Sequence, residues 1–135
     1  MHADWMKSLP YTVHTNMELG LMLRGLKPLA FFMEDYSRTP ERLLRYFRMF
    51  DRHVASGRFV KREHPVANAA RWNVHYILYA LPSEEWRIES MIELRERPGP
   101  WSADRERAFG QLLGYEEWMN DVWLARYPVG QASDA

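Results

Sequence analysis

The sequence predicts a small α+β fold, in which a sheet of about three strands, mixed or antiparallel, packs against helices and a helical hairpin ends the chain. The first observation is the segment 71–82, RWNVHYILYALP, whose two alternating faces are both largely apolar. Alternate side chains of a strand point to opposite faces, so this pattern indicates an interior strand covered on both sides. The other observations are an apolar stripe at helical spacing in 39–57 and two apolar segments separated by a glycine in 103–127.

Length and composition predict a single domain over residues 1–128, with a small, polar and disordered tail at 129–135. The 135-residue chain contains no cysteine, which excludes disulfides and thiolate metal sites. No run approaches the ~18 apolar residues of a membrane span. The first 16 residues lack the apolar middle of a signal peptide. We therefore expect a cytoplasmic protein without a membrane segment.

The first half of the chain predicts helix, strand, helix. A helix beginning at Thr15 or Asn16 should run to about residue 24, and Leu29–Glu34 is an apolar run of strand length. The clearest helix should occupy 37–57, with Thr39 as N-cap and Pro40 at the first helical position.

The second half predicts two strands and three helices. Residues 58–64 should form a strand that pairs antiparallel with 71–82. Segment 86–96 fits either a strand or a helix, and Ser83 as a possible N-cap favours the helix. Ser102 should cap a helix over 103–113, and Gly114 should separate it from a last helix over 115–127.

Charge is balanced overall but divided along the chain. Lys+Arg and Asp+Glu both number 18, yet residues 1–82 hold 12 basic and 7 acidic side chains, and residues 83–135 hold 6 and 11. The two halves could dock within the fold or between subunits, or the basic half could meet an anion. The candidate anion-binding residues are Arg38, Arg42, Arg45 and Arg52 on one predicted helix, and Lys27 before the first strand.

A charged helix face is ordinarily just solvated, and we prefer that interpretation of the arginines. Lys27 could bind an anionic substrate or simply face solvent. The C-terminal helix pair has the spacing of a DNA-binding helix-turn-helix, but Glu116, Glu117 and Asp121 would repel phosphates. Nucleic acid is therefore not the expected partner.

No known catalytic sequence motif is present, so candidate catalytic residues rest on position alone. His75 and Tyr79 share one face of the predicted interior strand and could line a cavity as an acid–base group and a hydrogen-bond donor. Glu34, Glu63 and His64 lie at the ends of the other two strands. The structural alternative is a core histidine and tyrosine with satisfied hydrogen bonds, and carboxylates that form turns.

His14 and Glu18 lie four residues apart and could share a metal if a helix began early enough. A metal site needs further ligands, and the sequence offers no complete set. We therefore predict neither a metal site nor a cofactor.

Three functions remain open. The first is a small binding or regulatory protein, of the kind found as bacterial or phage accessory proteins, that contacts a protein partner or a second copy through Trp118, Trp123 and Tyr127. The second is an enzyme or small-molecule binder with a pocket beside the interior strand. The third is binding of nucleic acid or another polyanion by the arginine-lined helix. Whether the protein is an enzyme stays open.

Overall fold

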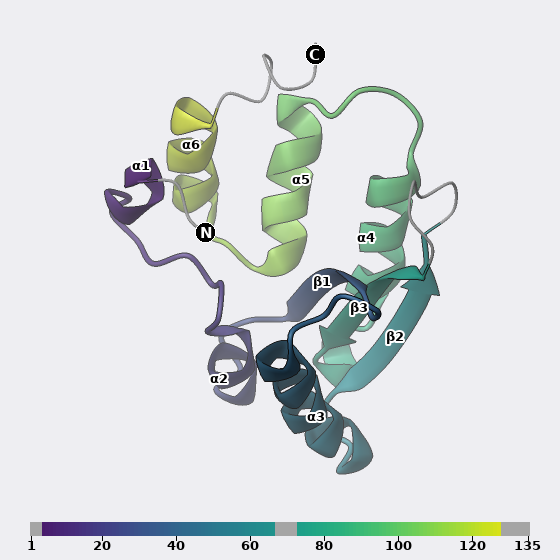
Figure 1. Cartoon of the computed structure of the whole chain (residues 1–135). Helices are drawn as coiled ribbons and strands as arrows, with labels where there is room; N and C mark the ends of the chain where they lie inside the picture. Colours follow the sequence, from purple (N-terminus) through teal and green to yellow (C-terminus); the bar gives the residue numbers. More distant parts are fainter. Residues whose placement is uncertain (1–3, 67–72, 128–135) are drawn as a thin grey trace.

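The structure, a computed structural model, describes residues 4–66 and 73–127 and confirms the predicted small α+β fold (Figure 1). Three antiparallel strands form one sheet in the order β1-β3-β2. The predicted tail and residues 67–72 lie outside the described residues. None of the described helices is long and apolar enough to cross a membrane. The elements in chain order are α1 (Asp4–Lys7), α2 (Glu18–Leu23), β1 (Leu29–Asp35), α3 (Glu41–Ala55), β2 (Val60–Pro65), β3 (Val74–Ala80), a 3-10 turn (Pro82–Glu84), α4 (Trp86–Glu96), α5 (Ala103–Leu113) and α6 (Glu117–Arg126).

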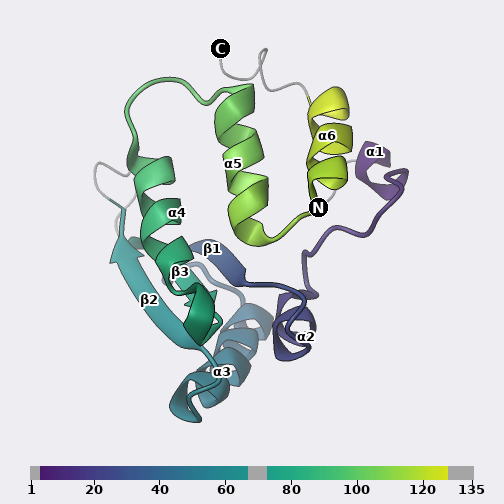
Figure 2. The ribbon, with the colours of Figure 1, turned by 180° about the vertical axis from the view of Figure 1, so that it is seen from behind.

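Strand β3 is the centre of the sheet, as its two apolar faces predict. It pairs with β1 from Leu29↔Ala80 to Asp35↔Val74, and with β2 from Val60↔Ala80 onward. Figures 1 and 2 show the sheet between α3 and the α4–α5 layer. The alternating side chains of β3 enter two separate cores, one under each helical layer.

Helix α3 covers one face of the sheet through its predicted apolar stripe. Phe47 and Phe50 are buried, and the Phe50 ring stacks on Tyr79 of β3 at 4.4 Å between centroids. The helix starts later than predicted, since Pro40, not Thr39, is the N-cap residue. The Thr39 hydroxyl donates instead to the Asp35 carbonyl at 2.9 Å, so it stabilises the turn after β1 rather than the helix.

Helices α4 and α5 cover the opposite face. Segment 86–96 is a helix, with Ile88, Met91 and Ile92 buried against β3 and β1. A 3-10 turn occupies the position at which Ser83 was expected to cap it. The buried Arg105 of α5 donates to the carbonyls of Leu94 at 2.7 Å and Arg97 at 2.9 Å, which supplies hydrogen-bond donors to carbonyls at the end of α4.

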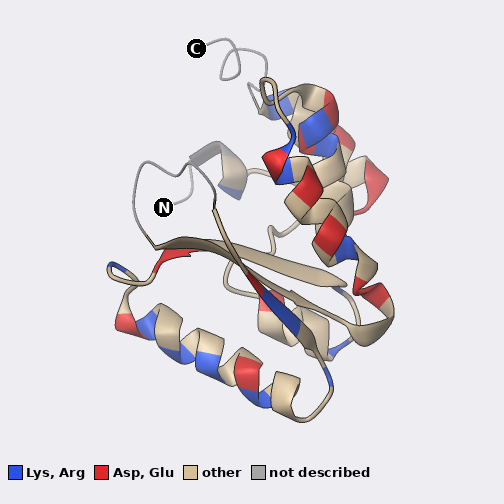
Figure 3. Cartoon of the chain, turned by 90° about the vertical axis from the view of Figure 1, so that its right-hand side faces the viewer, with Lys and Arg blue, Asp and Glu red and all other residues tan. Residues whose placement is uncertain are grey.

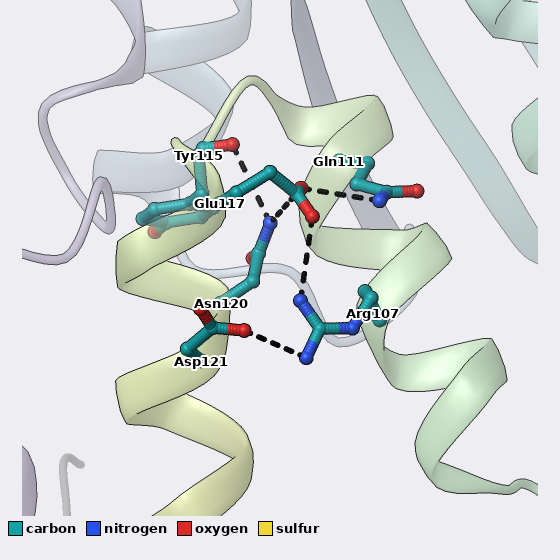
Figure 4. Close-up of polar contacts among 6 residues, drawn as sticks. All are labelled: Arg107, Gln111, Tyr115, Glu117, Asn120 and Asp121. Atoms are coloured by element: carbon teal, nitrogen blue, oxygen red, sulfur yellow. Dashed lines mark hydrogen bonds and ion pairs between the residues drawn. The ribbon is translucent and has the colours of Figure 1, made fainter.

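The α5–α6 hairpin forms as predicted. The Ser102 hydroxyl accepts from the Arg105 amide at 3.2 Å, and Gly114 ends α5 in a left-handed conformation at φ 92°. Polar side chains join the two helices: Arg107 pairs with Asp121 at 2.8 Å and with Glu117 at 3.3 Å (Figure 4).

Candidate functional site

A cavity of about 270 Å³ lies where the N-terminal segment, β1 and the α5–α6 hairpin meet. Figures 1 and 2 show the N-terminal segment passing beside α6 on its way down to α2. We call this space the Lys27 cavity, because the Lys27 side chain is its most buried charged group at 1% exposed. Its walls combine aromatic rings with a few ionisable side chains, which is typical of small-molecule sites.

The Lys27 amine is held by two partners that carry no negative charge. Its Nζ lies 2.8 Å from His14 Nδ1 and 2.8 Å from the Leu113 carbonyl oxygen. When the amine donates to Nδ1, that atom offers a lone pair and the proton of the neutral imidazole lies on Nε2. The ring of Tyr115 lies beside the amine, with its centroid 5.6 Å from Nζ. The alternative that Lys27 faces solvent is therefore wrong.

Two glycines bring Lys27 to the end of α5. Gly25 has φ 73°, a left-handed conformation that lets the chain leave α2 and turn toward β1. At Gly114 a Cβ would lie 2.3 Å from Cδ of Pro28, the residue after Lys27. Only a glycine permits this approach, so Gly114 both ends α5 and makes room for the Lys27 segment.

His14 is fixed by Tyr115. The two rings stack at 3.9 Å between centroids with 10° between their planes. The His14 amide donates to the Tyr115 hydroxyl at 2.8 Å, although 101 residues separate the two. The ring contact therefore sets the plane of the His14 imidazole, and the amide hydrogen bond fixes the backbone of the same residue.

Aromatic side chains and carboxylates form the rest of the wall. Glu106 accepts hydrogen bonds from the indoles of Trp101 at 2.7 Å and Trp123 at 2.8 Å. Glu18 accepts from the Tyr46 hydroxyl at 3.1 Å and also borders the cavity. Both carboxylates are thus held by neutral donors and leave a negative charge near the cavity.

The ionisable groups of the cavity have shifted pKa values. Burial lowers the pKa of Lys27 to about 7, and the Glu18 carboxylate acts in the opposite direction. Burial, with the Lys27 charge as a second cause, lowers the pKa of His14 to about 4. Burial raises the pKa of Tyr115 to about 12. Near neutral pH the imidazole is uncharged, and the amine exchanges its proton within the physiological range.

The predicted catalytic residues lie elsewhere, and none of the five lines this cavity. Tyr79 is fully buried under α3, where its hydroxyl donates to Asp51 at 2.9 Å. Burial raises the pKa of Tyr79, and the bond to Asp51 acts in the same direction. Asp51 also binds Lys61 at 2.8 Å, and Lys61 lies 3.7 Å from Glu63. The Tyr79–Asp51–Lys61 group is a closed polar network on the α3 side.

The structure does not join the five predicted residues by side-chain hydrogen bonds. His64 binds Glu96 at 2.8 Å, and Glu34 accepts from Thr39 at 3.4 Å. His75 lies beside the Tyr36 ring, 5.5 Å between centroids, and its buried Nδ1 has no hydrogen-bond partner among the described residues. The Tyr36 hydroxyl donates to Glu63. Glu63 and His75 therefore share Tyr36 as a neighbour. Their catalytic roles stay a prediction.

The predicted anion-binding arginines are exposed, and Figure 3 shows repeated basic positions along α3, which carries Arg42, Arg45 and Arg52. The sequence predicts a helix that includes Arg38, but Arg38 lies in the turn before α3. Arg48 pairs with Glu41 at 2.8 Å. Within residues 4–66 and 73–127, no carboxylate lies at ion-pair distance from the four predicted anion-binding arginines, Arg38, Arg42, Arg45 and Arg52. Lys27, the fifth predicted residue, lies in the cavity instead.

The predicted interface residues differ in exposure. Trp118 is 46% exposed and meets Tyr11 edge to face at 5.5 Å, whereas Trp123 and Tyr127 are half-buried and stack on each other at 5.3 Å. Trp86, at the start of α4, is more exposed than Trp118, at 56%.

The sequence pointed to His14 with Glu18 as a pair and to Lys27 separately, but not to Tyr115 or Glu106. His14 and Glu18 do border one site, but no described group of three or more His, Asp or Glu side chains is placed to hold a metal ion. Comparison with known proteins finds no matching family model, no similar curated protein and no similar solved structure. Function must therefore be argued from the geometry of the site.

Proposed function

We propose that the protein binds a small organic molecule in the Lys27 cavity. The observation that supports this proposal most is the buried Lys27 amine, which borders a cavity and, among the described residues, has only neutral hydrogen-bond partners. Pockets that combine apolar walls with a few convergent polar groups and shifted pKa values are the usual places for ligands.

The cavity size limits the ligand to about one ring. A cavity of about 150 Å³ in another protein holds benzene, and ligand pockets usually span about 300–1,000 Å³. At about 270 Å³, the Lys27 cavity suits a single-ring compound, or an aliphatic one of similar size, with a short polar substituent. Phe31, Phe109 and Trp123 offer contacts to the ring, and Lys27 with His14 offers contacts to the substituent.

The test uses single-ring compounds with different substituents: benzoate, benzyl alcohol, benzylamine and benzaldehyde. Amide chemical-shift mapping by NMR should show that at least one of them perturbs residues around the cavity. Thr15 borders the cavity and is exposed, so Thr15→Trp should block its mouth and abolish these shifts. The matched control is Thr12→Trp, at an exposed residue outside this cavity, which should leave them unchanged. The proposal fails if no compound binds, or if Thr15→Trp binds as well as the wild type.

Polyanion binding by α3 is a second candidate, favoured by four exposed arginines without a carboxylate partner among the described residues. Arginines that bind phosphates release counterions, so retention on heparin should fall steeply with salt. Charge reversal in Arg42→Glu with Arg45→Glu should abolish retention. The control Arg107→Glu changes a base on α5 that already pairs with Asp121. Salt-independent retention, or no retention, would eliminate this candidate.

Contact with a protein partner or a second copy stays a prediction. Its support is the exposure of Trp86 and Trp118, because exposed tryptophans often concentrate binding energy at interfaces. Light scattering would test self-association, and a mass equal to one chain at all concentrations would exclude the homodimer.

A further inference from the structure

We propose that Lys27 is a nucleophile that forms an imine with a small aldehyde or ketone bound in the Lys27 cavity. This inference rests on the proposed function, and it adds the substrate class and the bond that forms. It is carried by three features of one site: a buried primary amine, a neutral imidazole at hydrogen-bond distance from it, and an adjoining cavity.

An amine attacks a carbonyl carbon only when its lone pair is free, so a lysine that is held as a cation cannot react. No carboxylate in the described part of the chain pairs with the Lys27 amine at ion-pair distance. Burial disfavours its charged form, as in lysines that enzymes activate by removing them from water.

His14 is placed to move the proton. Attack of neutral Nζ forms a bond to the carbonyl carbon and leaves a positive nitrogen and a negative oxygen. His14 Nδ1, 2.8 Å from Nζ, accepts a proton from that nitrogen, and proton transfer to the oxygen gives a neutral carbinolamine. The nitrogen lone pair then forms the C=N bond as the C–O bond breaks, and the departing hydroxide takes up the remaining N–H proton and leaves as water. One water leaves for each imine formed, and no oxidant or reductant takes part.

The apolar walls favour the dehydrated product. Water is a product of imine formation and a reactant in its reversal, so a site that excludes water protects the imine. The rings of Phe31, Phe109 and Trp123 border the cavity and fit a carbonyl compound with an apolar or aromatic body. Glu18 and Glu106 would repel a ligand with further negative charge, so a neutral aldehyde or ketone fits better than an oxo acid.

A purely structural role for Lys27 is the competing interpretation. The amine donates to the Leu113 carbonyl at the end of α5, and a buried donor that caps a helix needs no chemistry. The two interpretations differ in reactivity, because a structural amine stays unmodified in the folded protein.

The chain supplies its own controls, since Lys7 and Lys61 are its only other lysines. Lys7 is exposed, and Lys61 is paired with Asp51. The folded wild-type protein is incubated near neutral pH with benzaldehyde and cyanoborohydride, which reduces an imine to a stable secondary amine. Peptide mapping by mass spectrometry then reports modification at each lysine and separately at the α-amine.

Lys27 should be modified at least about ten-fold faster than Lys7 or Lys61, because an ordinary lysine with a pKa near 10.4 is almost entirely protonated near neutral pH. Thr15→Trp should abolish modification of Lys27 and leave the other two lysines unchanged. Lys27→Arg keeps a cation but has no reactive amine, so it should lose only this adduct. Equal or slower modification of Lys27 overturns the inference, and the wild-type comparison stands even if a variant does not fold.

The experiment distinguishes failure of the ligand-binding proposal from failure of the imine proposal. Benzyl alcohol has the same ring but no carbonyl group, and its binding is followed by NMR. If benzyl alcohol binds in the cavity and benzaldehyde leaves Lys27 unmodified, the imine inference is wrong and the proposed function stands. If none of the four ring compounds binds and benzaldehyde leaves Lys27 unmodified, both proposals are wrong.

Discussion

Two lysines of this protein lie beside tyrosine rings, yet they have opposite surroundings. Lys27 lies 5.6 Å from the ring centroid of Tyr115, and Lys61 lies 5.4 Å from that of Tyr79. Lys61 pairs with Asp51 at 2.8 Å, whereas Lys27 meets an imidazole and a backbone carbonyl at the same distance. The difference is the counter-charge, because both amines have an aromatic neighbour and two close polar partners.

A counter-charge determines what a lysine can do. A carboxylate stabilises a protonated amine, and Lys61 has such a partner in Asp51. Neutral acceptors stabilise the protonated amine less than a carboxylate does, and burial lowers the pKa of Lys27 to about 7. Polar networks under a sheet are common structural features, whereas a titrating amine beside a cavity marks a candidate site.

The largest expected effect comes from Gly114→Ala, which should disrupt the packing that positions Lys27. A Cβ at Gly114 would lie 2.3 Å from Pro28 Cδ and 3.0 Å from its Cγ, and φ is 92°. We expect a loss of about 3 kcal/mol of unfolding free energy from strain and overlap together. Chemical denaturation measures it, and loss of the Lys27 benzaldehyde adduct should accompany it.

The matched control is Gly57→Ala at the end of α3. Gly57 has φ 82°, but a Cβ there meets nothing within 4 Å, so only the conformational cost of about 1 kcal/mol applies. Equal losses in the two variants would show that the Pro28 contact is unimportant.

The next effect is the pH dependence of stability. The pKa of Lys27 falls from 10.5 to about 7 on folding, so the unfolded chain binds more protons between those values and stability should rise with pH there. The contribution is at most about 1.4 kcal/mol per pH unit. Lys27→Met should remove this rise, and Lys61→Met should retain it. Urea denaturation from about pH 6 to about pH 9 makes the comparison, and equal slopes in wild type and Lys27→Met would contradict the assignment.

The smallest expected effect is the difference in stability between the variants Tyr79→Phe and Tyr115→Phe. Tyr79→Phe removes a hydrogen bond to a carboxylate from a fully buried position, and we expect a loss of about 2 kcal/mol. Tyr115→Phe removes an acceptor from the His14 amide, at a cost of about 1 kcal/mol. Tyr115→Phe should also change the pH profile of Lys27 modification, whereas Tyr79→Phe should not. If only Tyr79→Phe altered that profile, the two sites would be coupled and the comparison would fail.

The sequence predicted the fold where local pattern and burial agree. The two apolar faces of 74–80 require a central strand, and Ser102 with Gly114 marks both ends of α5. Thr39 was misjudged because its hydroxyl bonds Asp35 in the preceding turn, and nothing in the local pattern distinguishes that bond from a helix cap. The sequence of 86–96 fits both the period of a strand and the period of a helix. Burial of its apolar side chains against β3 favours the helix.

The candidate site was only partly predictable. Lys27 stood out as a lysine at a strand entrance, and His14 with Glu18 as a spaced pair. Their common site depends on α5, whose Leu113 carbonyl lies 86 residues from Lys27, and on Tyr115, which is 101 residues from His14. Such contacts arise from tertiary packing, and no short-range spacing in the sequence encodes them.

The most direct test of the difference between the lysines is the pH profile of their modification. A trace of a labelled acylating reagent is added to the folded protein across a range of pH, and peptide mapping gives the rate at each lysine. We expect Lys27 to reach half of its maximal reactivity at about pH 7, which matches its lowered pKa. A midpoint near the ordinary lysine value of about 10.4, or no modification of folded Lys27 at any pH, would contradict the claim that burial without a carboxylate at ion-pair distance makes this amine reactive.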